Sequence, residues 1–443
     1  MSGNTPLREA LEEYLAKDFS RLHMPGHKGL PLYPFGETFR YDVTEVEGTD
    51  SLYQASGAIA ETEKRFSALY GTAASLLSAG GSTLCIQAML ALAVGAGGKV
   101  IAARNAHIAA VSAMALLDIQ PVWVSPRYDE AYSFLGAVEP AAVAAALAEN
   151  PDAKAVYITS PSYFGILSDI PTLAALCHSK GVFLLVDNAH GAHLPFVKRN
   201  LHPIAQGADL CCDSLHKTLP VLTGGALLHI GNPRFVAGAK AAMALFGSTS
   251  PSYLIMLSMD AALPYLEQKA AGDFAALVQR TASLQRLARA RGFFIPDEPC
   301  DPTRLTIGFG EVGMTREAFS RHLREYKIEP EYLSHNMAVL LPAPQSPLRD
   351  WGRLYRMLDV VSPAPSLTFA PPPTLPQRAC SLREAVFAPK ESIPVDAALG
   401  RVAGELYAPC PPGVPLAVAG EILDEFALYC LKSAGLLHVN VLQ

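Results

Sequence analysis

The sequence predicts an α/β protein built on a mostly parallel, doubly wound sheet. Short apolar runs rich in strand-forming residues alternate with helical stretches between residues 74 and 230. Strands and helices that alternate at this spacing are joined by crossover connections, which leave the strands parallel. One apolar run, residues 182–186, stops abruptly at an acid, Asp187. Because ligands of such sheets bind beyond the carboxyl ends of the strands, we expect the chemistry at this edge.

The composition is that of a compact globular protein. The chain has 443 residues, of which 50% are hydrophobic and 17% charged, enough for two or three domains. A net charge of −6 without basic clusters argues against nucleic acid as a partner. The apolar segment 86–97 is too short to span a membrane, and residues 1–17 lack the apolar stretch of a secretory signal. Eight cysteines without paired metal spacing indicate reduced thiols and a cytoplasmic protein.

The first half of the chain supplies the sheet and the helices that cover it. An amphipathic helix is expected over residues 4–18, and a second helix ends at Gly71, which suits a helix terminus. Periodicity and length decide which later runs are strands and which are helices. The predicted strands are 74–78, 99–103, 121–125, 154–159, 182–187, 208–212 and 223–230, and the helices among them are 82–94, 104–117, 139–150 and 172–181.

The second half adds helices and a smaller α+β region. Helical stretches continue beyond residue 235 and include a long helix near 266–292. Strand-like runs at 304–309 and 338–343, a helix at 315–326 and a last helix after residue 421 follow. The proline-rich stretch 363–376 is expected to be a linker or an extended wrap. We therefore predict an N-terminal arm (1–40), a large domain (41–290) and a C-terminal small region (291–443).

Asp187 and Lys217 form the first candidate pair for chemistry. The lysine follows the predicted strand 208–212 and lies in a polar turn with Ser214 and His216. An acid and a lysine at one sheet edge suit pyridoxal phosphate. The amine forms a Schiff base with the aldehyde, and the acid keeps the pyridine nitrogen protonated. Taken alone, the pair has a simpler explanation, which is an ordinary strand-end acid and a surface lysine.

A glycine turn supplies a candidate anchor for the phosphate. Gly80 and Gly81 let the backbone approach a ligand, and Ser82 and Thr83 begin a helix whose free N–H groups favour an anion. By itself this motif is also an ordinary helix cap. It gains weight because pyridoxal phosphate requires such an anchor.

The two histidines of the segment HMPGHKG are a weak candidate for a metal site. His23 and His27 are four residues apart, which is the spacing of a helical metal pair. Pro25 and Gly26 lie between them and prevent the helix that this pair needs. We therefore expect no metal.

The motifs together resemble the ornithine/lysine/arginine decarboxylase family, pyridoxal-phosphate enzymes of the aspartate-aminotransferase fold (fold type I). The resemblance extends over nearly the whole chain, in the compact form without an N-terminal wing domain. It implies a large domain with a mostly parallel, seven-stranded sheet and a smaller α+β C-terminal domain. The matching segments are HMPGHKG, DVTEVEGTDSLY, GGST, RNAH, TSPSYFG, VDNAHGAH, DSLHKTLP, STSPSY, REAVFAPKE and CPPGVPLAVAGE.

The resemblance implies a role for each matching residue. Lys217 would hold the cofactor aldehyde, Asp187 would pair with the pyridine nitrogen, and His107 would stack on the ring. His190 would line the ring, and Ser162 would lie near the ring hydroxyl. The site would lie at the interface of a homodimer. The residues implied to hold the phosphate are Gly81, Ser82, Thr83, Ser214 and His216, with Ser248 and Thr249 reaching the neighbouring subunit's phosphate.

The substrate is predicted to be a basic amino acid, which would lose its carboxylate to leave an amine. Tyr53 and Glu421 are candidate substrate contacts, and Glu47 and Asp50 are further acids that could meet a cationic side chain. The chain departs from the family pattern at Asn188, where larger members carry a glutamate.

Two other functions stay open at this point. One is different chemistry on the same cofactor, such as transamination or a lyase reaction, because one fold hosts many reactions. Aminotransferases of this fold hold the substrate carboxylate with an arginine, and Arg353, Arg356 and Arg383 lie in the C-terminal part. The other is a catalytically silent protein that binds an amino acid.

Overall fold

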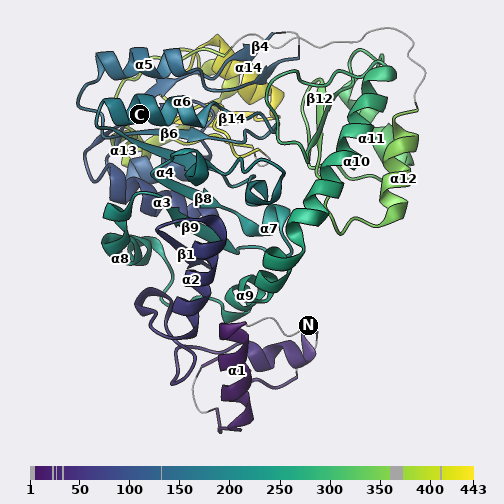
Figure 1. Cartoon of the computed structure of the whole chain (residues 1–443). Coiled ribbons are helices and arrows are strands. Elements are labelled where there is room, and N and C mark those ends of the chain that lie inside the picture. The colour runs from purple at the N-terminus through teal and green to yellow at the C-terminus, as the bar shows by residue number, and fades with distance from the viewer. Residues whose placement is uncertain are drawn as a thin grey trace. The chain divides into compact units, whose positions relative to one another are not determined.

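The computed structural model describes residues 5–21, 24–25, 27–31, 34–130, 132–359, 373–409 and 412–443 (Figure 1). Its contacts divide the chain into two compact units that interleave along the sequence. Unit 1 comprises Met1–Ala93 and Phe183–Asp273, and unit 2 comprises Val94–Val182 and Phe274–Gln443. The division of the chain near residues 40 and 290 stays a prediction.

Seven strands form the main sheet, in the order β1-β9-β8-β7-β6-β2-β3. The strands are β1 (Ala74–Ser78), β2 (Lys99–Ala103), β3 (Gln120–Val124), β6 (Ala155–Thr159), β7 (Phe183–Asp187), β8 (Leu210–Asp213) and β9 (Ala226–Ile230). β7 and β8 run parallel, as do β6, β2 and β3. Only β9 runs antiparallel to its neighbours, β1 and β8. The predicted α/β class with a mostly parallel, seven-stranded sheet is therefore confirmed.

Apolar spacing and glycine caps explain the helices of unit 1. Its helices are α1 (Pro6–Ala16), α2 (Ala58–Tyr70), α3 (Gly81–Ala93), α7 (Leu215–Thr218), α8 (Val236–Phe246) and α9 (Tyr253–Gln268), with short turns η1 (Gly36–Tyr41), η2 (Leu52–Gln54), η3 (Leu194–Phe196), η4 (Pro203–Gln206) and η5 (Pro233–Phe235). Leu7 and Leu11 lie on one face of α1 and are fully buried. Each buried leucine contributes about 1.5–3 kcal/mol, which holds α1 against α2 and α9. α2 ends at Gly71, whose φ of 66° is left-handed, as predicted.

Unit 2 contains the remaining three strands of the main sheet and three small sheets. Its helices are α4 (Ile108–Leu116), α5 (Pro140–Glu149), α6 (Ile170–Ser179), α10 (Ala270–Ala290), which begins at the end of unit 1, α11 (Arg316–Glu325), α12 (Leu348–Met357), α13 (Leu382–Phe387) and α14 (Glu425–Ser433), with the turn η6 (Val395–Ala397). The small sheets are β10-β12-β11, β13-β14 and β4-β5. Their strands are β4 (Tyr128–Asp129), β5 (Phe134–Leu135), β10 (Leu305–Gly308), β11 (Tyr332–Leu333), β12 (Met337–Leu340), β13 (Lys390–Pro394) and β14 (His438–Leu442).

Some expectations differ from the structure. The long helix expected from residue 266 begins at Ala270, because the backbone leaves the helical conformation at Lys269, where φ is −126°. The strands β13 and β14 were not predicted. Residues 363–372 of the proline-rich stretch lie outside the described residues, as does His23. Among the helices that the structure describes, none is long and apolar enough to cross a membrane.

Candidate active site

Asp187 and Lys217 lie at the carboxyl ends of two neighbouring parallel strands of unit 1. β7 ends at Asp187, and the register of the parallel pair places Asp187 opposite Cys212 of β8. Lys217 lies in α7, the one-turn helix that begins two residues after β8 ends. Because the strands are parallel, both side chains belong to the same edge of the sheet, where open α/β sheets bind ligands.

The lysine contacts an imidazole from the segment that follows the acid. Lys217 Nζ lies 2.8 Å from His190 Nε2. The acid itself is 2% exposed, and its Oδ1 accepts hydrogen bonds from the Ala189 N–H at 3.1 Å and from the Cys212 thiol at 3.5 Å. The turn after β7 therefore makes both contacts: its Ala189 N–H binds Asp187, and its His190 ring contacts Lys217.

The start of α3 and the turn after β8 come together at two hydroxyls. Ser214 Oγ donates to Ser82 Oγ at 2.9 Å. Gly81 opens α3 with a left-handed φ of 68°, a conformation that glycine adopts at no steric cost. Thr83 is exposed in the first turn of the same helix. The helix N-terminus and these hydroxyls form a cradle for an anion.

These groups fit pyridoxal phosphate. Lys217 would supply an amine for the aldehyde, Asp187 a carboxylate for the pyridine nitrogen, and the start of α3 donors for the phosphate. His216 has a more restricted role than expected. Its Nδ1 donates to the Gly225 carbonyl at 3.1 Å, which leaves only Nε2 for a ligand, and burial lowers the pKa of this imidazole. A neutral His216 would accept at Nε2, so it donates to a phosphate only when protonated.

Tyr53 lies against Gly247, the residue that precedes Ser248 and Thr249, in unit 1. A Cβ added at Gly247 would lie 1.8 Å from the Tyr53 hydroxyl, so only glycine fits there. Burial raises the pKa of the Tyr53 phenol, which stays protonated at neutral pH. Ser248 and Thr249 are exposed. The structure therefore groups one predicted substrate contact with the two residues expected to reach a neighbouring subunit.

His107 and Ser162 belong to unit 2. His107 is the N-cap of α4, and its Nδ1 accepts the Ala109 N–H at 3.1 Å. Its ring packs against Gly413, where a Cβ would lie 2.5 Å from Nε2. Ser162 is buried, and its Oγ accepts the Ile166 N–H at 3.2 Å.

Two acids predicted to meet a cationic substrate have partners within the protein. Glu421 is 1% exposed, and its Oε2 accepts from Arg104 at 3.0 Å and from the Val418 N–H at 2.9 Å. Asp50 accepts the N–H groups of residues 51, 56, 57 and 59, which caps the start of α2. These partners account for the Asp50 carboxylate and for Oε2 of Glu421, whereas Oε1 of Glu421 is buried with no hydrogen-bond partner among the described residues. A role of either acid toward the substrate stays a prediction. Glu47 is exposed.

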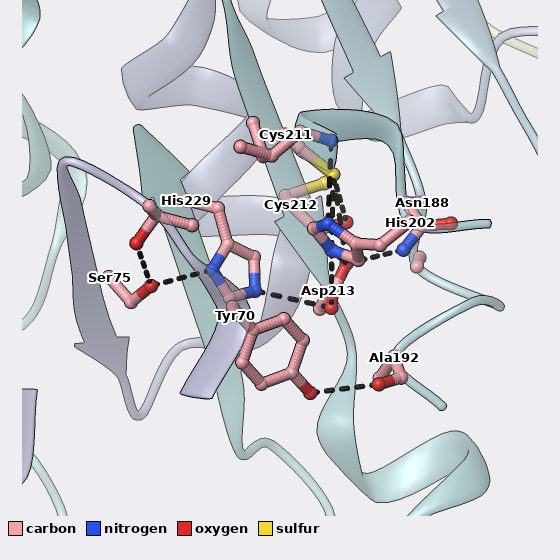
Figure 2. A network of polar contacts seen from close by, with 12 residues as sticks. Tyr70, Ser75, Asn188, Ala192, His202, Cys211, Cys212, Asp213 and His229 are labelled. Carbon is pink, nitrogen blue, oxygen red and sulfur yellow. Dashed lines mark hydrogen bonds and ion pairs between the residues drawn. The ribbon is translucent and has the colours of Figure 1, made fainter. Parts of the chain in front are cut away.

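Sequence reasoning missed a buried polar cluster beside the lysine turn (Figure 2). Asp213, the last residue of β8, contacts His202 and His229, which are 11 and 16 residues away in the sequence. Tyr70 covers both imidazoles at ring-centroid distances of 5.2 and 4.4 Å. An acid directly before Ser214 was the only local signal for this cluster, because its partners come from separate elements.

Comparisons with known proteins agree with the predicted family. Residues 5–293 match the family model described as Orn/Lys/Arg decarboxylase, major domain. The uncharacterized protein YaaO of Bacillus subtilis is 31% identical, with 94% of this chain and 92% of that protein covered. An arginine decarboxylase of Bacillus subtilis is 28% identical, with 95% and 91% covered. The lysine decarboxylase LdcF of Francisella novicida shares the fold, with a TM-score of 0.84 at 17% identity over 99% of this chain and 81% of that one. The chain therefore belongs to the Orn/Lys/Arg decarboxylase family, pyridoxal-phosphate enzymes with the type I fold.

Proposed function

We propose that this protein decarboxylates a basic amino acid (arginine, lysine or ornithine) to the corresponding amine. Membership of the family supports the reaction, and the 28% identity to an arginine decarboxylase over 95% of the chain supports the substrate class. The observation that carries the proposal is the contact of Lys217 with His190 at the sheet edge that also carries Asp187. A lysine amine for the aldehyde and a carboxylate for the pyridine nitrogen are the two groups that binding of pyridoxal phosphate needs.

Lys217 is the residue that we assign to the cofactor aldehyde. To attack an aldehyde, its amine must lose a proton, and His190 Nε2 at 2.8 Å can accept that proton. Asp187 is assigned to keep a proton on the pyridine nitrogen. When bound, pyridoxal phosphate supplies an electron sink for the pair that remains when carbon dioxide leaves.

The other predicted residues are assigned to binding and orientation. His107 is assigned to the ring face, where it would help hold the bond to the substrate carboxylate perpendicular to the ring. Ser162 is assigned to the ring hydroxyl, and Tyr53 to the substrate. Lys217 and His216 are the two candidates to return a proton to the substrate Cα. The phosphate is assigned to Gly81, Ser82, Thr83, Ser214 and His216.

We also propose that the active form is a homodimer and that it works in the cytoplasm. Ser248 and Thr249 are exposed beside Tyr53, which is consistent with a role across a subunit interface. The seven described cysteines are reduced thiols, as expected of a reducing compartment.

The test is cofactor binding followed by carbon dioxide release. Purified protein is expected to show the visible absorbance of lysine-bound pyridoxal phosphate, and Lys217→Ala is expected to lose it. Lys198→Ala, an exposed lysine of the same unit, is the matched control and keeps it. A Lys217→Ala variant with an unchanged spectrum contradicts the assignment.

Incubation with arginine, lysine and ornithine then separates the possible functions. Carbon dioxide and the matching amine support decarboxylation. A keto acid without carbon dioxide indicates transamination. Two of the arginines that could hold a substrate carboxylate in such a reaction have partners within the protein. Arg383 donates to the Leu116 carbonyl, and Arg353 lies 3.5 Å from Asp350. Bound cofactor without turnover of any amino acid indicates a silent protein.

A further inference from the structure

The buried carboxylate of Asp213 accepts hydrogen bonds from three separate segments of unit 1 (Figure 2). Asn188 Nδ2, in the turn after β7, donates to Oδ1 at 2.6 Å. His202 Nε2, just before η4, lies 3.2 Å from Oδ2, and His229 Nε2, on β9, lies 3.2 Å from the same oxygen. Asp213, His202 and His229 are fully buried, so these contacts are shielded from water.

The surroundings of the two imidazoles identify which nitrogen carries each proton. The Ile204 N–H points at His202 Nδ1 at 3.4 Å, so Nδ1 accepts and Nε2 carries the proton towards Asp213. His229 Nδ1 lies 2.8 Å from the Ser75 hydroxyl, which can donate to it. Burial alone would raise the pKa of the Asp213 carboxyl, but the two histidines bring it below its ordinary value. Asp213 is therefore a buried anion that accepts hydrogen bonds from both imidazoles and from the Asn188 amide.

A metal ion is the obvious competing interpretation of this cluster. Donor atoms of His202, Cys211 and Asp213 lie within 4.8 Å of one another. A metal on His202 Nε2 would displace the proton to Nδ1, where it would face the Ile204 N–H and create a donor–donor conflict. Burial also raises the pKa of the Cys211 thiol well above its ordinary value, which disfavours the thiolate ligand. The cluster is better satisfied by hydrogen bonds than by an ion.

Asp213 connects both halves of the candidate cofactor site. Its partner Asn188 follows Asp187 directly, and the Asn188 N–H donates to the Cys212 carbonyl at 3.0 Å. Cys212, the residue before Asp213, donates its thiol to Asp187 Oδ1 at 3.5 Å. Asp213 also lies four residues before Lys217, the lysine assigned to the aldehyde. One carboxylate thus holds the end of β7 and the turn after β8 in a fixed relation.

We propose that Asp213 is a positioning residue that fixes Asp187 relative to Lys217, and that it determines the need for an amide rather than an acid at position 188. The inference rests on the proposed function, because it assigns Asp213 to the same cofactor site. A cofactor held by both Asp187 and Lys217 needs a fixed distance between the carboxylate and the amine. Misplacement of either group weakens its binding. An aspartate at 188 would bring two carboxylates to 2.6 Å, where they could not both be ionised.

The test is an exchange of the two side chains in the full-length protein. Asn188→Asp places an acid against Asp213, and Asn188→Asp with Asp213→Asn restores an acid–amide pair with its polarity reversed. In the double variant the amide oxygen at 213 still accepts from both histidines. The measurement is the dissociation constant for pyridoxal phosphate, obtained by visible absorbance titration of the apoprotein across a pH series, together with thermal unfolding.

Asn188→Asp is expected to bind the cofactor at least about tenfold more weakly than wild type. Two carboxylates at this distance share a proton, so the loss relative to wild type grows as the pH rises and that proton leaves. The double variant is expected to return to within about threefold of wild type, without the added pH dependence. Asp260→Asn is the matched control, because Asp260 is a buried carboxylate of the same unit that accepts from Thr62 and the Arg8 N–H. It is expected to change thermal unfolding but not cofactor affinity.

The outcomes separate this inference from the proposed function. Wild-type protein that fails to bind pyridoxal phosphate removes the proposed function, and the inference with it. Wild-type binding combined with an unchanged affinity of Asn188→Asp overturns the positioning role alone. A double variant that unfolds like wild type but still binds the cofactor weakly also overturns the positioning role alone. Stoichiometric zinc in the purified protein, lost in His202→Ala, would show that the cluster is a metal site instead.

Discussion

Gly413→Ala tests whether the C-terminal segment fixes the position of His107. Gly413 has a left-handed φ of 75°, and its carbonyl accepts the Ile108 N–H at 2.8 Å. An added Cβ would lie 2.5 Å from His107 Nε2 and 2.7 Å from Cδ2. Ordinary contacts between such atoms are about 3.5 Å, so the imidazole must move by roughly 1 Å. The substitution therefore displaces one side chain without changing its chemistry.

The displacement is large enough to measure in catalysis. A misplacement of about 1 Å can cost about 100-fold in rate, which corresponds to about 2.7 kcal/mol of transition-state stabilisation. If His107 orients the ring, kcat/KM for decarboxylation is expected to fall by about this factor. The left-handed backbone adds a strain of about 1–2 kcal/mol, which lowers the free energy of unfolding separately.

Gly400→Ala separates the two effects. Gly400 lies in the same unit with a φ of 76°, and its added Cβ meets no described atom within 4 Å. This control carries the backbone strain but leaves His107 in place. Decarboxylation by both variants, measured as carbon dioxide released with stability checked by thermal unfolding, gives the comparison. Equal kcat/KM values for the two variants would refute the positioning of His107 by Gly413.

Three further substitutions test the contacts of Glu421, Asp50 and Tyr53. Arg104→Ala leaves the buried Glu421 carboxylate without its cation, and burial already raises the pKa of that carboxyl. We expect the free energy of unfolding, measured in urea, to fall by about 3–5 kcal/mol. A changed preference between arginine and lysine without this loss of stability would indicate that Glu421 contacts the substrate. Backbone N–H groups hold the pKa of the partly buried Asp50 carboxyl below its ordinary value. The ionised carboxylate therefore stabilises the fold at neutral pH, and this contribution is lost as the pH falls through the lowered pKa. Wild type and Asp50→Asn are therefore expected to differ in melting temperature at neutral pH and to converge in acid; a constant difference would contradict the cap. Gly247→Ala drives a Cβ into the Tyr53 hydroxyl and is expected to cost about 1–3 kcal/mol of stability, whereas unchanged unfolding would mean that the two do not pack as described.

The sequence alone determined the features that depend on local periodicity and chemistry. Alternating strands and helices predicted the sheet, because apolar period and length report secondary structure directly. Gly71 marked the end of α2, since a left-handed residue there needs no distant partner. Asp187 and Lys217 could be named as candidates from the sequence because parallel strands bind ligands beyond their carboxyl ends, and the structure places both residues there.

Tertiary structure decided the features that depend on pairing between remote segments. The antiparallel direction of β9 could not be read from its composition, because an apolar run looks the same in either direction. The pairing of β13 with β14 joins residues that lie 44 to 52 positions apart, from the Pro394–His438 end of the pair to the Lys390–Leu442 end. Hydrogen bonds between strands leave no mark within either strand's own sequence.

The roles of the acids show the same division most clearly. The sequence offered Glu421 as a substrate contact, and only the structure shows that its Oε2 is paired with Arg104, 317 residues away. Asp213 stood unnoticed next to Ser214 because its donors come from a loop and from β9 as well as from the turn after β7. Sequence established that acids lie near the site, since residue type and local order are enough for that. Only the folded chain decided which partners each of these acids has, because that depends on long-range contacts and on exclusion of water.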